Sequence, residues 1–326
     1  MRYRPFGRTG LQVSELVFGG GWVGGILIHQ DDATKRAAIE RALEAGINWI
    51  DTAPSYGDGR SEEALGWLLE DVANKPYLST KVRLDLGRLD DIAGQVARSL
   101  EQSLERLRCD SVELFQLHNP IGPQTSGERI GVDQVLGEDG VADAFDRVRA
   151  QGLTRFTGIT AIGETGAIRE VIASGRFDSA QVYYNMLNPS AGQDMPPVWR
   201  GHDFRGLIAT CKEHGLAVMN IRVLAAGVLA TDERHGRESA MMPEADLPSE
   251  ERRARAVVQR LGGRYGTRAQ SAIRFALANP DTSCVVVGLA ELAHLEQALA
   301  AAEAGPLPDE ALAALREVYA AGFGSG

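Results

Sequence analysis

Short apolar runs and amphipathic stretches alternate along almost the whole chain. The apolar runs are rich in β-branched residues and often end in Gly, Asp, Lys or His, as is typical of strands buried in a parallel sheet. The stretches between them have the spacing of amphipathic helices. Strands are expected at residues 15–18, 48–51, 77–81, 112–117, 154–160, 179–184, 217–221 and 283–287. Helices are expected at residues 32–45, 61–69 (with Ser61 as its cap), 90–107, 141–151, 165–174, 204–214, 270–278 and 292–302.

Eight strands, each followed by a helix, predict a parallel sheet with helices outside it. Eight such units can close into a (β/α)8 TIM barrel, and no remaining segment is large enough for a second domain. We therefore expect an α/β fold, with one barrel domain over residues 1–326 and an N-terminal β-hairpin as a cap. An open doubly wound sheet is the structural alternative. Its first turn normally carries G-x-G-x-x-G, a spacing that Gly19-Gly20-Gly21 lacks.

Two connecting segments, residues 119–140 and 225–267, exceed the usual length of a connection. Both follow a strand, so the sequence predicts long loops at the C-terminal face of the barrel, where the active sites of such barrels lie. Residues 241–243 and the tail 322–326 are expected to be flexible.

The net charge of −10 changes the range of possible partners. No basic stripe is available to neutralise phosphates, so we expect no nucleic-acid partner. No stretch approaches the roughly 18 apolar residues of a membrane helix, and no apolar run follows the arginines of the first ten residues. These features predict a cytoplasmic protein that does not contact a membrane, and they leave its oligomeric state open.

The three cysteines, Cys109, Cys211 and Cys284, are far apart and odd in number. They form no CxxC pair and no spacing typical of metal ligands, so we expect reduced thiols and no metal site.

Four polar residues lie at or just beyond the ends of three consecutive strands: Asp51, Tyr56, Lys81 and His118. Each alone has an ordinary interpretation, as a turn cap, a loop aromatic, a solvated charge or a histidine at the edge of the core. Neighbouring strands of a barrel bring their C-terminal ends to one rim, however, and polar residues there are typical of catalysis. We therefore interpret the four as a catalytic set.

Reduction of a carbonyl group needs a proton donor such as this set contains, because a proton must reach the oxygen as hydride reaches the carbon. The reference pKa of a phenol, about 10, is too high for an efficient acid at neutral pH. A neighbouring ammonium lowers that pKa, and a carboxylate beside the ammonium keeps it charged and in place. A histidine can orient or polarise the carbonyl oxygen.

Several motifs resemble the aldo-keto reductase family, in the right order from about residue 3 to 302. They are G-I-N-W-I-D-T-A-P-S-Y-G at 46–57 with Ser61-Glu62 and Leu65-Gly66, G-R-T-G-L-Q-V-S at 7–14, Ser79-Thr80-Lys81 and Gln116-Leu117-His118. The resemblance implies that Tyr56 is the general acid/base, that Lys81 and Asp51 tune it, and that His118 positions the substrate. It also implies that a nicotinamide dinucleotide binds across the C-terminal face of the barrel.

The cofactor half of the chain departs from the family pattern. Thr160-Ala161 stands where the usual Ser-Asn pair holds the carboxamide, while Gln181 matches the glutamine at the nicotinamide. Ile221 replaces a stacking aromatic residue. Arg222 follows it, either as a partner of the pyrophosphate or as a salt-bridged scaffold residue. The remaining cofactor contacts that the resemblance implies are Gly20, Gly21, Trp22, Asp51, Leu224, Gly227, Gly288, Leu289, His294 and Gln297.

The last strand bears on the choice between NAD and NADP. NADP-preferring relatives commonly place a lysine just after this strand and an arginine a few residues later, where this chain has Gly288 or Leu289, and His294. Without both strong cations a 2′-phosphate loses its charge-assisted partners. We therefore expect NAD to be used at least as well as NADP.

The expected substrate pocket comprises Trp22, Tyr56, His118 and Asn119. Because the loop from Asn119 that borders this pocket contains both polar and apolar residues, the sequence does not distinguish sugars, aliphatic aldehydes and larger ketones as substrates. The first hypothesis is an NAD(P)-dependent oxidoreductase that interconverts a carbonyl (aldehyde, ketone or aldose) and an alcohol. The alternatives are a cofactor-binding redox sensor or regulatory subunit with little turnover, and a barrel with lyase or isomerase chemistry, which would leave the four polar residues unexplained.

Overall fold

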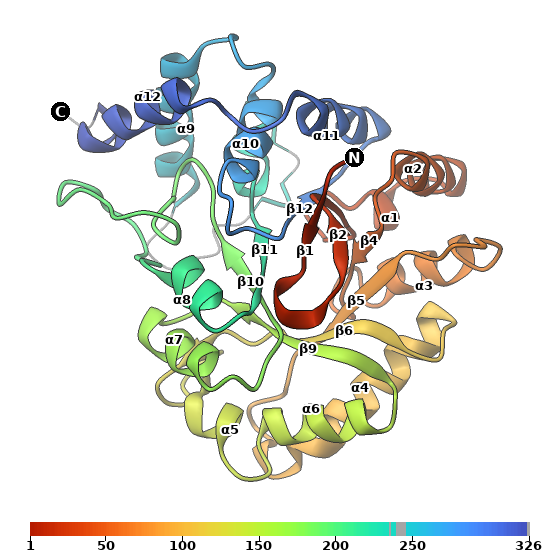
Figure 1. Cartoon of the computed structure of the whole chain (residues 1–326). Coiled ribbons are helices and arrows are strands. Elements are labelled where there is room, and N and C mark those ends of the chain that lie inside the picture. Colours follow the sequence, from red (N-terminus) through yellow and green to blue (C-terminus); the bar gives the residue numbers. More distant parts are fainter. Residues whose placement is uncertain (235, 239–245, 325–326) are drawn as a thin grey trace.

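Eight parallel strands form a closed barrel in the computed structural model, which describes residues 1–234, 236–238 and 246–324 (Figure 1). In order around the barrel they are β3 (Leu16–Gly19), β4 (Trp49–Asp51), β5 (Tyr77–Val82), β6 (Val112–Leu117), β9 (Thr154–Ala161), β10 (Ser179–Tyr183), β11 (Ala217–Ile221) and β12 (Cys284–Gly288). The barrel closes where β12 pairs with β3, with Val287 opposite Phe18 and Gly288 opposite Gly19. The α/β barrel expected from the alternating pattern is confirmed, and the open sheet is excluded.

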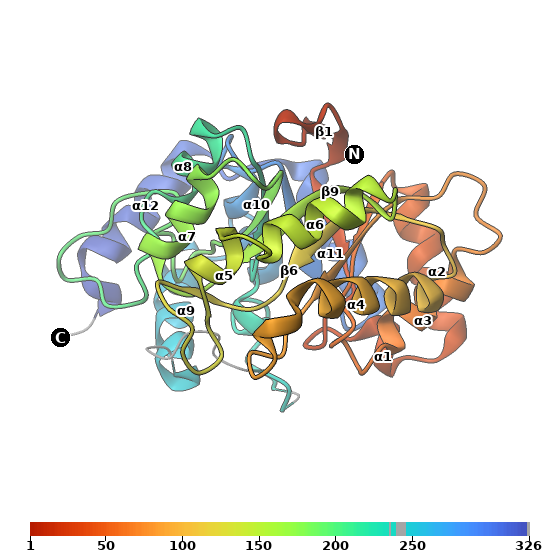
Figure 2. The same cartoon turned by 90° about the horizontal axis from the view of Figure 1, so that it is seen from below.

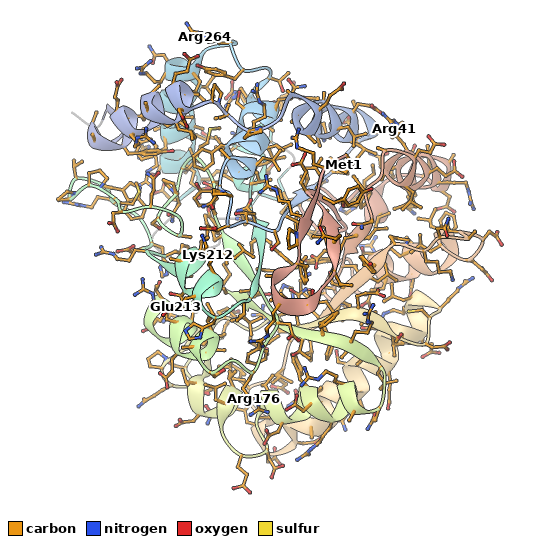
Figure 3. All side chains as sticks on the ribbon, in the orientation of Figure 1. Met1, Arg41, Arg176, Lys212, Glu213 and Arg264 are labelled. Atoms are coloured by element: carbon orange, nitrogen blue, oxygen red, sulfur yellow. The ribbon has the colours of Figure 1, made fainter. Side chains whose placement is uncertain are left out.

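Helices surround the barrel, one after each strand. They are α2 (Asp32–Glu44), α3 (Arg60–Leu68), α4 (Ile92–Leu107), α6 (Val141–Ala150), α7 (Thr165–Ala173), α8 (Leu207–Glu213), α10 (Arg268–Leu277) and α11 (Leu292–Ala304). Arg41 of α2 forms an ion pair with Glu296 of α11 at 2.6 Å (Figure 3). The last helix of the series therefore lies against the first, which completes the outer ring.

An N-terminal hairpin closes one end of the barrel, as expected. Strands β1 (Tyr3–Pro5) and β2 (Gln12–Ser14) pair in antiparallel fashion around a short 3-10 helix, η1 (Gly7–Thr9). The Phe6 ring packs against Trp49 inside the barrel, with ring centroids 4.7 Å apart. Figure 2 shows the hairpin at one end of the molecule and helix α9 (Leu247–Leu261) at the other. The barrel mouth that remains for a site is therefore the C-terminal one.

The two long connections are partly helical, which the sequence prediction missed. Residues 119–140 contain the short strands β7 (Ile121–Gly122) and β8 (Ile130–Gly131) and the helix α5 (Val132–Leu136). Residues 225–267 contain a 3-10 turn, η3 (Ala225–Gly227), and α9, whose N-cap Asp246 accepts a hydrogen bond from the Ser249 amide. Six of the fifteen residues of α9 are charged, and the helix buries a narrow apolar stripe of Ala254, Val257 and Leu261, so its apolar pattern is weak. Residues 241–243 lie outside the described residues.

Three further details correct the expected elements. Helices α1 (Ile26–His29) and α12 (Asp309–Ala320) were not anticipated. Ser61 does not cap α3: the N-cap is Gly59, at φ 88°, and the Ser61 hydroxyl donates instead to the carbonyl of Gly20 at 3.0 Å. The first residues of the tail form the 3-10 turn η4 (Gly322–Gly324). None of the helices in the described ranges combines the length and the hydrophobicity that a bilayer crossing requires.

Candidate active site

The C-terminal mouth of the barrel holds a buried ion pair next to a phenol. Lys81, the penultimate residue of β5, has a side chain with no solvent exposure, and its Nζ donates to Asp51 Oδ2 at 2.7 Å. The same nitrogen donates to the Thr52 carbonyl at 2.7 Å and to the Tyr56 hydroxyl at 3.2 Å. An ammonium has three donors, and all three are used. Lys81 is thereby fixed between a carboxylate and the phenol.

The carboxylate of Asp51 is held by neutral donors as well. Its Oδ1 accepts hydrogen bonds from the Ser79 hydroxyl at 2.7 Å, from Gln181 Nε2 at 2.9 Å and from Gln116 Nε2 at 3.2 Å. Two of these donors come from the adjacent strands β5 and β6, and the third comes from β10, which β9 separates from β6. A buried carboxylate is costly without such hydrogen-bond partners, so the network holds Asp51 in place beside Lys81.

Burial dominates the proton affinity of Tyr56. It raises the pKa of the phenol above its ordinary value, and the ammonium of Lys81 opposes this shift only in part. Lys81 lowers the pKa of Tyr56, as expected, but burial raises it by more, so the pKa of the phenol lies above its ordinary value. Burial also lowers the pKa of Lys81, but Asp51 and Tyr56 together raise it by more. At neutral pH the site thus contains a protonated phenol beside a charged lysine.

His118 follows β6 and completes the set. Its ring meets that of Tyr56 edge to face, with centroids 5.9 Å apart and an interplanar angle of 86°. Burial, followed by the charges of Lys81 and Arg83, lowers the pKa of His118 to about 3. The imidazole is therefore neutral at neutral pH and keeps one N–H donor for a polar group at the mouth.

The loop after β3 lines the same mouth. A side chain at Gly21 would begin 3.9 Å from the Tyr56 ring, so the loop backbone lies over the phenol. Gly20 is a packing position, because a Cβ there would lie 2.6 Å from the Ser61 hydroxyl. Trp22 is 41% exposed and contacts His29 edge to face at 4.9 Å. Trp22 thus stands partly exposed at the rim.

Asn119 differs from the other expected pocket residues. It is buried, and its side-chain amide spans the backbone of Leu84: it accepts from the Leu84 N–H at 2.7 Å and donates to the Leu84 carbonyl at 3.0 Å. This pair of bonds ties the end of β6 to the segment after β5. The structure therefore gives the Asn119 side chain a structural contact next to the pocket.

The strand ends opposite Tyr56 offer polar groups that suit a dinucleotide. The Thr160 hydroxyl, at the end of β9, is buried and has no hydrogen-bond partner within the described structure. An unsatisfied buried hydroxyl is costly, so it points to an additional polar group at that position. Gly288, at the end of β12, is exposed and nothing lies within 4 Å of a Cβ built on it. This open backbone allows a phosphate to approach closely.

A strained turn follows β11. Arg222 has φ 61°, and Ala225 and Ala226 have φ 46° and 55°, values that residues with a side chain rarely adopt. The Asn185 amide holds the turn by donating to the Arg222 carbonyl at 2.9 Å. Strain of this kind persists where surrounding contacts over-determine the backbone, and it clusters at functional sites.

The other residues expected at the cofactor differ in their burial and in their hydrogen-bond partners. Leu289 is buried and its carbonyl accepts from the Ile26 amide at 3.0 Å. On α11, His294 Nδ1 accepts from the Ala290 amide at 3.3 Å and Gln297 accepts from the Thr267 hydroxyl at 2.9 Å. Ile221, Leu224 and Gly227 lie along the β11 end and its turn. These residues share the rim between β11 and α11.

Sequence reasoning missed two residues of this site. Ser79 and Gln116 each lie two positions before a recognised residue, Lys81 and His118, so they share its face of the strand. That period of two would have identified them. In the described part of the chain, no cluster of His, Cys, Asp or Glu could hold a metal ion.

A closed parallel barrel with a lysine, an aspartate, a tyrosine and a histidine gathered at its C-terminal mouth is the architecture of barrel oxidoreductases that act on carbonyl groups. The sequence profile of the Aldo/keto reductase family matches residues 15–320, and the chain belongs to this family.

Individual relatives agree with this assignment. The chain is 29% identical over 306 residues to L-galactose dehydrogenase from Arabidopsis thaliana, covering 91% of this chain and 87% of the relative. It is 29% identical over 272 residues to D-threo-aldose 1-dehydrogenase from a Pseudomonas species, covering 72% and 74%. Its fold matches that of an aldo-keto reductase from Bacillus halodurans, solved in its holo form, with a TM-score of 0.76, 23% identity and coverage of 98% and 96%. The chain is therefore an oxidoreductase of a family that interconverts carbonyl and alcohol groups and generally uses NAD(P)H.

Proposed function

We propose that this protein interconverts an aldehyde, ketone or aldose and the corresponding alcohol, with Tyr56 as the general acid/base. The observation that carries the proposal is the 3.2 Å hydrogen bond from Lys81 Nζ to the Tyr56 hydroxyl. A fixed positive charge therefore lies beside a phenol whose ring borders Gly21 and His118. A substrate oxygen bound there receives the phenolic proton, and Lys81 stabilises the phenolate that forms.

His118 serves this step as a neutral donor. Because its pKa lies at about 3, it holds one ring proton at all ordinary pH values. It can donate a hydrogen bond to the substrate oxygen without competing with Tyr56 for the transferred proton. The edge-to-face contact between the two rings keeps both donors on one side of the pocket.

NAD(P)H is the cofactor of the proposal, and when bound it supplies the hydride. The orphaned hydroxyl of Thr160 and the open backbone at Gly288 fit such a ligand. The residues proposed to hold it are Gly20, Gly21, Trp22, Asp51, Thr160, Gln181, Ile221, Arg222, Leu224, Gly227, Gly288, Leu289, His294 and Gln297. Gln181 donates a hydrogen bond to Asp51, so the two side chains are proposed to line the same wall of the cofactor site.

We also propose that NAD serves at least as well as NADP. A 2′-phosphate needs strong cations, and the positions expected to provide them are Gly288 or Leu289, and His294. His294 Nδ1 accepts a hydrogen bond from the Ala290 amide at 3.3 Å, so this ring nitrogen is engaged by the backbone of the protein itself.

Aldoses are the first substrates to test, because two relatives are named as sugar dehydrogenases. The experiment follows nicotinamide absorbance with NAD(H) and NADP(H) in parallel, over aldoses, aldehydes, ketones and secondary alcohols. Turnover of at least one class with NAD at or above the NADP rate is expected. Cofactor binding without turnover of any class would favour the alternative function, a redox sensor or regulatory subunit. Absence of cofactor binding would overturn the proposal.

A further inference from the structure

Two residues lie one step deeper in the barrel than the buried ion pair. Trp49 precedes Asp51 by two positions on β4, so the two side chains lie on the same face of that strand. Ser79 precedes Lys81 by two positions on β5 and stands directly opposite Asp51 in the pairing of the two strands. All four residues are buried. The strand register therefore places Trp49 and Ser79 next to the ion pair, on the side away from the mouth.

The indole of Trp49 is bonded to the hydroxyl of Ser79. Its Nε1 donates to Ser79 Oγ at 3.0 Å. The rest of the ring packs in an apolar cluster that includes Leu114 and Met219, with Phe6 of the N-terminal hairpin 4.7 Å away between ring centroids. A buried indole N–H in apolar surroundings needs an acceptor, and Ser79 supplies it.

This bond determines the direction in which Ser79 donates. An indole N–H can only donate, so Ser79 Oγ accepts from Trp49 and keeps its single proton for another partner. That partner is Asp51 Oδ1, at 2.7 Å. The other oxygen, Oδ2, accepts from Lys81 Nζ at 2.7 Å, and the same nitrogen donates to the Tyr56 hydroxyl at 3.2 Å. A continuous chain of hydrogen bonds thus connects Trp49, in the depth of the barrel, with the phenol at its mouth.

We propose that Trp49 and Ser79 are positioning residues for proton transfer by Tyr56. The indole directs the Ser79 hydroxyl, and the hydroxyl holds Oδ1 of Asp51 so that Oδ2 stays turned toward Lys81. This inference rests on the proposed function, because it takes Tyr56 as the group that exchanges a proton with the substrate. Trp49 and Ser79 have no solvent exposure, so their effect on the reaction passes through Asp51 and Lys81. Hydrogen bonds in a buried chain polarise one another, which lets the first donor influence the last.

The test is the single-turnover rate of NADH consumption at saturating carbonyl substrate, for the wild type, Ser79→Ala, Trp49→Phe and the double variant. Ser79→Ala is expected to lower this rate by about three- to tenfold, the effect of one lost hydrogen bond. The half-saturating substrate concentration and the NADH dissociation constant should stay at wild-type values, because the change lies away from both ligands. Trp49→Phe should lower the rate in the same direction. The double variant should be no slower than Ser79→Ala, because Trp49 acts through Ser79.

A second cycle separates positioning of the phenol from a structural role. If Ser79 acts through Tyr56, Ser79→Ala should not slow the residual reaction of Tyr56→Phe any further. A purely structural effect would instead slow both backgrounds by the same factor. Ser103→Ala is the matched control, since it removes a buried hydroxyl on α4 that accepts from Arg106 at 3.4 Å, outside the barrel. Its single-turnover rate should equal that of the wild type.

The outcomes for this inference and for the proposed function differ. A wild-type rate in Ser79→Ala, or equal slowing by Ser79→Ala in the presence and absence of the Tyr56 hydroxyl, would overturn the inference and leave the proposed function intact. If Trp49→Phe does not fold, the cycle of Ser79→Ala with Tyr56→Phe still decides the role of Ser79. A Tyr56→Phe variant as fast as the wild type would overturn the proposed function itself.

Discussion

Gln181 on β10 donates from Nε2 to Oδ1 of Asp51 on β4, at 2.9 Å, across the interior of the barrel. The two residues are 130 positions apart in the chain. Because Asp51 also holds Lys81, this bond connects the strand ends proposed to bind the cofactor with the buried ion pair beside Tyr56. Gln116 donates to the same oxygen at 3.2 Å from β6.

The two glutamines can be separated by experiment. Gln181→Leu and Gln116→Leu each remove one donor from a buried carboxylate, so each is expected to lower the free energy of unfolding by about 1–3 kcal/mol. Only Gln181→Leu is expected to weaken binding of NADH as well, because Gln181 alone belongs to the proposed cofactor wall. Urea denaturation and fluorescence titration measure the two effects. Equal losses of NADH affinity in both variants would show that Gln181 acts only through Asp51.

The Asp51–Lys81 pair should matter for stability. Asp51→Asn leaves the buried Lys81 ammonium without its counter-ion, which typically costs about 3–5 kcal/mol. Glu128→Gln is the control, because its ion pair with Arg83 is largely exposed and such pairs contribute about 0–1 kcal/mol. Urea denaturation at pH 7 compares the two. A loss in Asp51→Asn as small as in the control would mean that Lys81 is not held as a buried charge.

The lowered pKa of His118 should make the free energy of unfolding depend on pH in a specific way. Its pKa is about 3 in the folded protein and about 6.5 in the unfolded chain, so the unfolded chain binds the proton first as the pH falls. The contribution of a neutral His118 to stability is therefore present above pH 6.5 and is lost progressively between 6.5 and 3. His118→Phe should lose less unfolding free energy than the wild type between pH 7 and pH 5, by up to about 2 kcal/mol. Identical losses would contradict a strongly lowered pKa.

The cofactor preference can be shifted at one position. His294→Arg adds a permanent cation near the start of α11, where a 2′-phosphate is expected to lie. The affinity for NADPH should rise by about tenfold with little change for NADH, since one charge-assisted bond is gained. Titration of both cofactors tests this. A variant that leaves the ratio of the two affinities unchanged would place the 2′-phosphate elsewhere.

The barrel and the gathering of polar strand ends follow from local patterns in the sequence. Apolar runs gave strand positions within one or two residues, and β6 and β11 match their expected bounds. Side chains alternate between the two faces of each strand, and neighbouring strands end at the same rim, so Asp51 and Lys81 are expected to contact each other. Such features depend on side chains that alternate along each strand, which the sequence displays directly.

Other parts of the site depend on tertiary contacts that no local pattern displays. Helix α9 has six charged residues among fifteen and packs against α12, so it could not be inferred from its narrow apolar stripe. The net pKa of Tyr56 likewise depends on how deeply the phenol is buried, which neighbours in sequence do not reveal. Asn119 was expected in the pocket from its place after His118, but its amide is bonded to Leu84.

The most direct test of proton transfer by Tyr56 is kcat/KM of Tyr56→Phe in carbonyl reduction, with the NADH dissociation constant measured on the same sample. Phenylalanine keeps the ring against His118 and removes only the hydroxyl that Lys81 contacts. We expect kcat/KM to fall by about 10²–10⁴-fold, with the NADH dissociation constant unchanged. A variant that reduces the substrate as fast as the wild type would show that another group donates the proton.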